Sequence, residues 1–242
     1  MFPIGDENVG RVRTPYVNWT LIVLNALAFL YELTLSPRAL DAFFFQFGAV
    51  PAVITQYDNL SSILTSMFLH AGWAHFLGNM LFLFVFGDNI EDAMGHVSYL
   101  LFYLLCGIAA ALTQIVLNPE STIPMVGASG AISGVLGAYI ALFPHGKVRA
   151  LVILGFFIQV VLVPAWVMLG LWFVLQLVSG VASLGVGGDT GGVAFWAHIG
   201  GFVAGVLLVW VFRDRDHVAR QRAIRAQHEA WQRVPARASD SF

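Results

Sequence analysis

Two residues of this 242-residue chain, Ser129 and His198, have side chains whose chemistry differs from that of their surroundings. Ser129 belongs to the run GASG at 127–130, and His198 is followed by two glycines at 200–201. Both lie within apolar stretches, where a polar side chain is costly and usually marks a functional site facing a bundle interior or a water cavity. A serine that attacks a carbonyl and a histidine that accepts its proton can carry out acyl transfer. The pair therefore indicates hydrolysis inside a membrane.

The composition indicates a membrane protein. The chain is 58% hydrophobic and 11% charged, with a mean hydropathy of +0.78, whereas soluble domains average about 25% charged residues. We therefore expect an all-α polytopic membrane protein with six transmembrane helices. The six apolar segments lie near 17–35, 61–86, 97–117, 127–143, 150–183 and 192–212. Because the fifth is too long for one span and contains Pro164, we interpret 150–163 as interfacial or kinked and 165–183 as the crossing.

The distribution of basic residues predicts the orientation in the membrane. Six crossings put both ends of the chain on one side, together with the loops near 87–96 and 144–149. Of the 12 Lys and Arg residues, only Arg38 falls on the other side. The positive-inside rule then predicts a cytoplasmic segment at 1–15, a membrane domain at 16–212 and an Arg-rich cytoplasmic tail at 213–242. The arginines of this tail suit lipid headgroups better than nucleic acid.

The fourth apolar segment is too short to cross a bilayer. Its 15 residues from Ser129 to Phe143 would form a helix of roughly 22 Å, against about 30 Å of hydrocarbon. With Pro144 at the cytoplasmic face, Ser129 lies below the outer surface, and residues 118–128 must dip into the membrane. Non-helical backbone is tolerated at that depth only inside protein or along a wet cavity. The length therefore predicts a water pocket at Ser129.

Small residues follow both reacting groups at helical spacing. These are Gly130, Gly134, Gly137, Gly201 and Gly205. Small-residue faces let membrane helices approach closely, which would bring the Ser129 hydroxyl within about 2.6–3.2 Å of the His198 ring. Taken alone, the pattern also fits simple helix packing, a dimerising helix or a transporter.

The second segment supplies His75 and Asn79, which lie four residues apart and share one helix face. Both side chains donate hydrogen bonds without an obligatory charge, which suits an oxyanion beside the Ser129 amide. A polar patch that joins helices is the alternative. His70, His75 and His198 could also be considered as zinc ligands, but such a site needs firm support from surrounding groups. We expect neither metal nor cofactor, and a dyad without a buried carboxylate.

In combination, these motifs closely resemble the rhomboid family of intramembrane serine proteases. The matching elements are the GASG run at 127–130, Ala197-His198 with its two later glycines, and His75 with Asn79. The order of the motifs matches over roughly 15–212. The resemblance implies a six-helix rhomboid-like bundle in a bacterial cell membrane.

The resemblance also implies residue roles and a reaction. Ser129 would be the nucleophile and His198 the general base and then the acid, while His75, Asn79 and the Ser129 amide would stabilise the oxyanion. The substrates would be transmembrane segments of other membrane proteins, cut through an acyl-enzyme without metal or nucleotide.

Two features depart from the family pattern. The first long loop, 36–60, lacks the Trp-Arg pair of many members, and we expect its phenylalanines to pack at the bilayer interface. These are Phe43, Phe44, Phe45 and Phe47. Some relatives place a tyrosine four residues after the serine, where it supports the histidine ring. Ser133 occupies that position, so another group must orient His198.

Two other classes of function compete with a protease. A rhomboid-fold binding protein could hold membrane clients without cutting them, although such relatives typically lose the serine or the histidine. A small transporter or channel would suit the glycine-rich helices, but the mid-membrane carboxylates and paired broken helices of ion-coupled transport are not evident.

Overall fold

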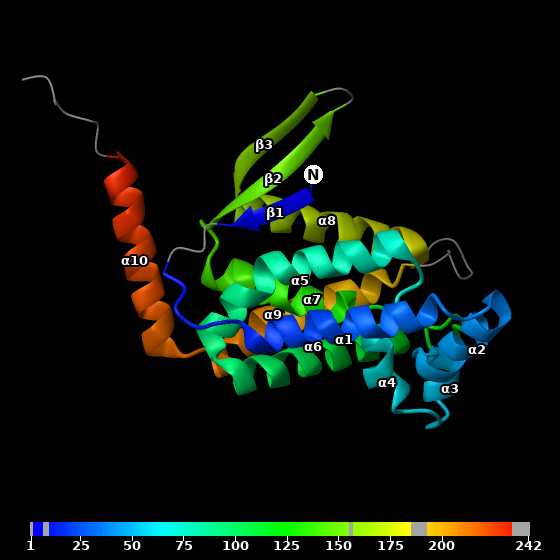
Figure 1. Ribbon diagram of the computed structural model, residues 1–242. Helices are drawn as coiled ribbons and strands as arrows, with labels where there is room; N and C mark the ends of the chain where they lie inside the picture. Colours follow the sequence, from blue (N-terminus) through cyan, green and yellow to red (C-terminus); the bar gives the residue numbers. More distant parts are fainter. Residues whose placement is uncertain (1, 7–9, 155–156, 185–192, 234–242) are drawn as a thin grey trace, which may run out of the picture.

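The computed structural model describes residues 2–6, 10–154, 157–184 and 193–233. Within them the chain is mostly helical. The long helices run alongside one another except for the last one, which stands across one end of the bundle (Figure 1). The long helices are α1 (Tyr16–Glu32), α5 (Trp73–Met94), α6 (His96–Leu117), α7 (Ser129–Leu142), α8 (Ala165–Leu184), α9 (Phe195–Phe212) and α10 (Arg215–Arg233). Shorter pieces are α2 (Pro37–Phe47), α3 (Pro51–Ile54), α4 (Ser62–Thr65) and the 3-10 turn η1 (Ser66–Phe68). The strands are β1 (Phe2–Asp6), β2 (Lys147–Leu154) and β3 (Phe157–Pro164).

Among the described residues, three helices are long and apolar enough to cross a membrane, namely α6, α8 and α9. The pair formed by α4–η1 and α5 would make a fourth span if the bent pair counts as one. The prediction of a mostly helical, multi-span membrane protein is confirmed. The number of six crossings stays a prediction, because α1 has 17 residues and α7 only 14.

The second apolar segment is not one helix, as its hydropathy predicts, but two helical pieces bent by 91°. The bend falls at 69–72, where Gly72 has a φ of 155°, a conformation that residues with side chains rarely adopt. Helix α5 then continues to Met94, well past the apolar run. The expected loop near 87–96 is therefore helical over most of its length, and Gly95 alone separates α5 from α6.

The last turns of α5 carry polar side chains that are buried by the two ends of the described chain. They are Asp88, Asn89, Glu91 and Asp92. Glu91 accepts a hydrogen bond of 2.7 Å from the backbone N–H of Asn18 at the start of α1. Asp92 accepts one of 2.6 Å from the N–H of Arg13 and contacts Nε2 of His217 in α10 at 3.0 Å. The carboxylates thus join the N-terminal segment and α10 to the same end of the bundle.

Residues 147–154 and 157–164 form two paired strands, so the interpretation of 150–163 as a partly interfacial or kinked stretch preceding the span is corrected to paired strands. β2 and β3 are antiparallel with Val148 opposite Val163, and β1 adds to the free edge of β2 in the order β1-β2-β3. β2 and β3 project away from the helices on the side where α8 lies (Figure 1). Strand pairing satisfies the backbone of a segment whose β-branched residues favour strands. The crossing expected at 165–183 coincides with α8.

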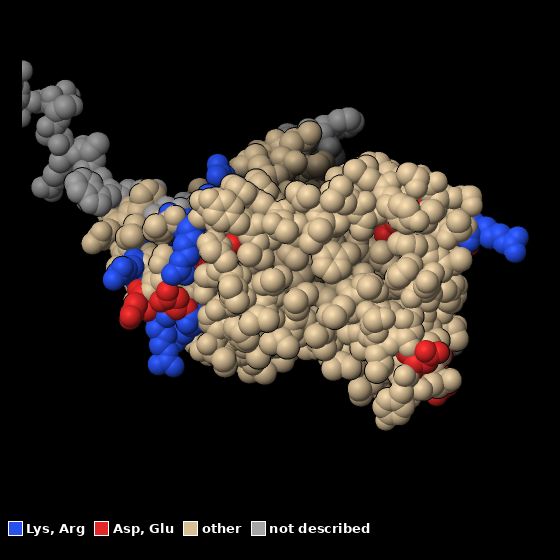
Figure 2. Space-filling view, turned by 60° about the horizontal axis from the view of Figure 1, so that its bottom comes forward, with Lys and Arg blue, Asp and Glu red and all other residues tan. Residues whose placement is uncertain are grey.

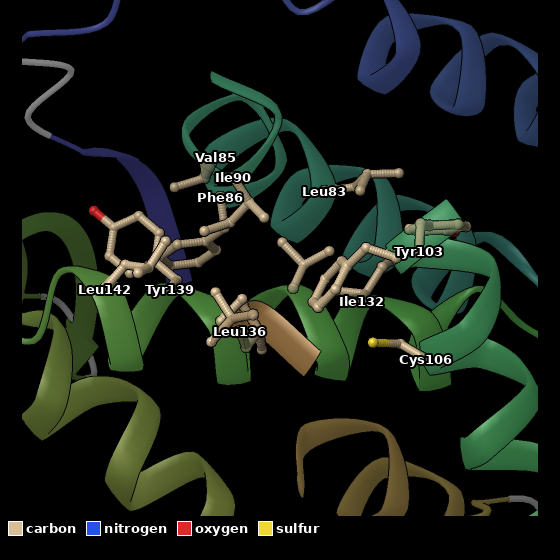
Figure 3. Packing of buried hydrophobic residues seen from close by; sticks show 14 of the residues in the cluster. Leu83, Val85, Phe86, Ile90, Tyr103, Cys106, Ile132, Leu136, Tyr139 and Leu142 are labelled. Atoms are coloured by element: carbon tan, nitrogen blue, oxygen red, sulfur yellow. The ribbon is translucent and has the colours of Figure 1, made fainter. Parts of the chain in front are cut away.

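Helix α7 is the centre of the core and packs against α5, α6, α8 and α9. Figure 3 shows Phe86 and Ile90 of α5 pointing toward the α7 side chains Leu136 and Tyr139. The rings of Phe86 and Tyr139 meet edge to face with centroids 4.9 Å apart. These contacts fix the helix on which Ser129 is the first residue.

Candidate active site

Ser129 and His198 meet in the structure, although they lie on different helices. Ser129 opens α7, and His198 lies in the first turns of α9. Nε2 of His198 lies 2.8 Å from Oγ of Ser129. This is the distance that proton transfer between a nucleophile and its base requires.

The glycines on both helices explain how the two residues come so close. A Cβ atom on Gly201 would lie 2.1 Å from the carbonyl oxygen of Gly130, and one on Gly205 would lie 2.0 Å from that of Gly134. Neither space would admit a methyl group without movement of the backbone. The small-residue faces therefore serve as the packing surface between α7 and α9, which the sequence left open.

The backbone before Ser129 is non-helical and hydrogen-bonded to other parts of the chain. Met125 exchanges two hydrogen bonds with Ala49, of 3.0 and 2.9 Å, and the N–H of Gly127 donates to Ser66 O at 2.9 Å. Gly127 has a φ of 125°, a conformation reserved largely for glycine. These pairings satisfy polar backbone that would otherwise face lipid.

His75 lies next to Ser129, as the oxyanion hypothesis requires. A Cβ atom on Gly127 would lie 2.6 Å from Nε2 of His75 and 3.6 Å from Oγ of Ser129. The imidazole and the hydroxyl thus flank the same point, and the missing side chain of Gly127 provides the room for the ring.

Asn79 follows His75 by one turn of α5 and is buried. Its Nδ2 atom has no hydrogen-bond acceptor among the described residues. An unpaired buried donor is costly in a protein interior. A donor in this position is suited to an oxygen atom supplied by a bound substrate.

These four residues line one large, partly open cavity of about 1250 Å³. The cavity confirms the pocket that the shortness of α7 predicts at Ser129. Two phenylalanines of α2, Phe44 and Phe45, also line it. Phe43, by contrast, packs against Tyr31 and Phe47, with ring centroids 5.4 and 4.8 Å away.

Three side chains around His198 were not identified from the sequence. Gln176 of α8 places Oε1 2.8 Å from Nδ1 of His198, and the Trp172 ring lies 5.9 Å from the imidazole between centroids. Gln114 of α6 accepts a hydrogen bond of 3.3 Å from the N–H of Ala197. Polar residues within apolar spans were the signal that could have identified both glutamines.

Ser133 does not take part in orienting the histidine. Its hydroxyl donates a hydrogen bond of 2.6 Å to the carbonyl oxygen of Ser129, one turn earlier in α7. The expectation that a group other than Ser133 contacts the His198 ring agrees with this geometry.

The three histidines considered as zinc ligands do not form a ligand set. In the parts of the chain that the structure describes, no group of three His, Cys, Asp or Glu side chains could hold a metal ion. The His70 ring packs against His75 and Phe29, with centroids 5.2 and 6.4 Å away.

Comparison with known proteins identifies the family. A Rhomboid domain is matched over residues 57–215, which is more than half of the chain and includes Ser129, His198, His75 and Asn79. The chain belongs to the rhomboid family. The matched region runs from just after α3 to the start of α10.

Individual rhomboid proteins are similar over shorter or longer parts. Rhomboid-like protein 11, chloroplastic, of Arabidopsis thaliana is 31% identical over 69% of this chain and 59% of its own length. Rhomboid protease GluP of Bacillus subtilis is 39% identical over 40% of this chain and 19% of GluP. Inactive rhomboid protein 1 of Drosophila melanogaster is 36% identical over 35% of this chain and 6% of that protein. The chain thus spans less than two thirds of each relative, and the family contains proteases as well as proteins named inactive.

Proposed function

We propose that this rhomboid protein is an intramembrane serine endopeptidase that cleaves transmembrane segments of other membrane proteins. The observation that carries the proposal is the 2.8 Å contact between Ser129 Oγ and His198 Nε2 at the wall of a cavity. A rhomboid protein that only binds its clients has no need of this contact. The geometry also agrees with a reaction in which a serine and a histidine are the two reacting groups.

The reaction follows from the positions of the protein groups. Oγ of Ser129 attacks the scissile carbonyl carbon while its proton passes to Nε2 of His198. The carbonyl oxygen becomes an oxyanion, which His75, Asn79 and the Ser129 amide stabilise by donating hydrogen bonds. When the C–N bond breaks, the proton moves from Nε2 to the leaving amine and an acyl-enzyme remains. Water then attacks the acyl-enzyme while His198 accepts its proton, and the same proton transfer back to Ser129 Oγ releases the enzyme.

The attack on a peptide carbonyl restricts the form of the substrate. A peptide carbonyl within a helix is hydrogen-bonded to the N–H four residues later, and must leave that bond before it can be attacked. We therefore propose substrates whose transmembrane helix unwinds easily near the cut. The resemblance to rhomboid proteases further implies a small residue before the cut. Cleavage-site mapping on a panel of single-span proteins tests this preference.

We further propose that the protein is a multi-pass protein of a bacterial cell membrane, with α10 and the N-terminal segment on the cytoplasmic side. Figure 2 shows most of the visible Lys and Arg side chains at the end of the bundle where α10 lies. Arg38, on α2, lies at the opposite end. Labelling of single cysteines at positions 38 and 220 with a membrane-impermeant reagent in intact cells tests the orientation.

Purified protein in detergent and in liposomes should cut a single-span substrate, and Ser129→Ala and His198→Ala should each abolish cleavage. Ser133→Ala, one turn along the same helix, is the matched control and should remain active. Cleavage retained in a folded Ser129→Ala or His198→Ala variant would overturn the proposed roles. Failure of a fluorophosphonate probe to label Ser129 would instead favour the client-binding class.

A further inference from the structure

Gln176 is the side chain that contacts the nitrogen of His198 facing away from Ser129. It lies on α8, whereas the reacting residues lie on α7 and α9. The Gln176 Oε1 atom is 2.8 Å from Nδ1, and Ser129 Oγ is 2.8 Å from Nε2. The imidazole is therefore held between an amide and a hydroxyl, with one contact on each ring nitrogen.

The chemistry of the amide oxygen determines which nitrogen carries the proton. A neutral imidazole has one N–H donor and one acceptor nitrogen. Because Oε1 can only accept, Nδ1 must be the donor in this contact. Nε2 is then the bare nitrogen, which can accept the Ser129 proton. The opposite tautomer would place a proton on Nε2 and block the base.

An amide is suited to this position because it adds no charge. Helix α8 is long and apolar enough to span a membrane and contains no Asp, Glu, Lys or Arg between 165 and 184. A carboxylate there would carry a large desolvation cost. Gln176 is also the only amide side chain on this helix.

Neither Ser133 nor Trp172 supplies this acceptor. The hydroxyl of Ser133 is engaged with the Ser129 carbonyl at 2.6 Å. The Trp172 ring, also on α8, lies tilted by 36° to the imidazole and can fix its plane but cannot accept a proton from Nδ1.

We propose that Gln176 is a positioning residue that holds His198 in the tautomer with a bare Nε2, in the place that a carboxylate occupies in a Ser-His-Asp triad. The proposal rests on the proposed protease function, because the tautomer matters only where His198 acts as a base. Gln176 itself touches neither the substrate nor the reacting atoms of Ser129.

Two substitutions of Gln176 test the proposal. Gln176→Met keeps the length of the side chain but removes the acceptor, so kcat should fall about 10- to 100-fold, up to the lower end of the roughly 100- to 10,000-fold that a general base contributes, while KM changes less than about threefold. Gln176→Glu retains an acceptor and stabilises the imidazolium form. It should therefore recover activity relative to Gln176→Met at alkaline pH, with the acidic limb of the kcat profile moved to higher pH.

Leu175→Ala, at the neighbouring exposed position of α8, is the matched control and should retain wild-type kcat and pH profile. Wild-type kcat with an unchanged pH profile in Gln176→Met would overturn the proposal. So would a folded Gln176→Glu enzyme that is as slow as Gln176→Met at every pH.

Nitrogen NMR of histidine-labelled protein provides a readout that does not depend on cleavage. The neutral His198 ring should carry its proton on Nδ1 in the wild type and lose this preference in Gln176→Met. A proton on Nε2 in the wild type would overturn the inference even in an active enzyme. Conversely, a wild-type protein that cleaves no substrate would contradict the protease function. The position of the proton on the His198 ring would then show by itself whether Gln176 fixes the tautomer.

Discussion

The Tyr139 hydroxyl donates a hydrogen bond of 2.7 Å to Oδ2 of Asp6 and thereby joins the first strand of the chain to the helix that begins at Ser129. Asp6 also accepts one of 2.9 Å from the side-chain amide of Asn89 in α5. Within the sheet, Asp6 lies opposite Val148 of β2. One buried carboxyl group thus links β1, α5 and α7.

Asp6 should give the stability of the protein a measurable dependence on pH. Burial raises the pKa of Asp6 from 3.8 to about 6, with a smaller contribution from the Asp88 carboxylate, while Tyr139, Arg225 and Arg11 oppose the shift. Because the folded state then holds the proton more tightly than the unfolded chain, the contribution of Asp6 is fully present below about pH 4. It is lost as the pH rises to about 6.

Asp6→Asn removes this titration and still offers Tyr139 an acceptor. We therefore expect the apparent Tm of the wild type to fall relative to that of Asp6→Asn between about pH 4 and 6, by several degrees. Thermal unfolding in detergent across this range measures the difference. A constant difference between the two proteins would show that Asp6 does not titrate there.

The contact between α7 and α9 should tolerate no added carbon at Gly205. A Cβ atom there would lie 2.0 Å from the Gly134 carbonyl oxygen, so Gly205→Ala must push the helices apart. We expect a loss of about 1–3 kcal/mol in stability, as for other overpacked sites. Cleavage should also be reduced, because the Ser129–His198 contact lengthens.

Gly170→Ala is the control for Gly205→Ala, since a Cβ atom at Gly170 of α8 meets nothing within 4 Å. Alanine has the higher helix propensity, by about 1 kcal/mol. The control should therefore be as stable as the wild type or more so, and fully active. Equal Tm and activity for both variants would contradict the close-packing argument.

The meeting of Ser129 and His198 could be predicted because both are polar residues in apolar segments and both precede glycines at helical spacing. The pocket could be predicted from the length of α7. Gln176 satisfies the same criterion of a polar residue in a span, yet an amide suggests no reaction by itself, and only its distance from Nδ1 gives it a role. A contact between residues on different helices cannot be inferred from the spacing of residues within either helix.

The paired strands β2 and β3 and the bend at 69–72 were not predicted, for related reasons. Both segments are as apolar as a membrane span, so hydropathy does not distinguish them from one. The β-branched residues on either side of 155–156, in β2 and β3, were a signal that predicts strands. Glu91 and Asp92 fall in the expected loop near 87–96, and their burial could not be predicted because it depends on α10 and the N-terminal part of the chain, which are far apart in the sequence.

Gly127 should be essential for both its conformation and its missing side chain. Gly127→Ala would place a Cβ atom 2.6 Å from Nε2 of His75 at a φ of 125°. We expect a cost of about 1–3 kcal/mol from the backbone strain and a lower kcat from displacement of His75.

Gly78→Ala, where a Cβ atom has no neighbour within 4 Å, is the control. Cleavage assays and thermal unfolding of the two variants, measured side by side, separate these effects, and a fully active Gly127→Ala protein would contradict the placement of His75.

Asn79 should act in the transition state and contribute little to substrate binding. Its Nδ2 atom is buried without an acceptor among the described residues and lines the same cavity as Ser129 and His198. Asn79→Leu keeps a similar volume and removes the donor, so kcat should fall about 100- to 1000-fold, as when an oxyanion donor is lost, with little change in KM. The stability of the variant should be equal or higher, because the donor is unpaired in the free enzyme. Leu77→Ala, at an exposed position two residues earlier in α5, is the control. A wild-type kcat in Asn79→Leu, or an effect on KM alone, would show that only His75 and the Ser129 amide stabilise the oxyanion.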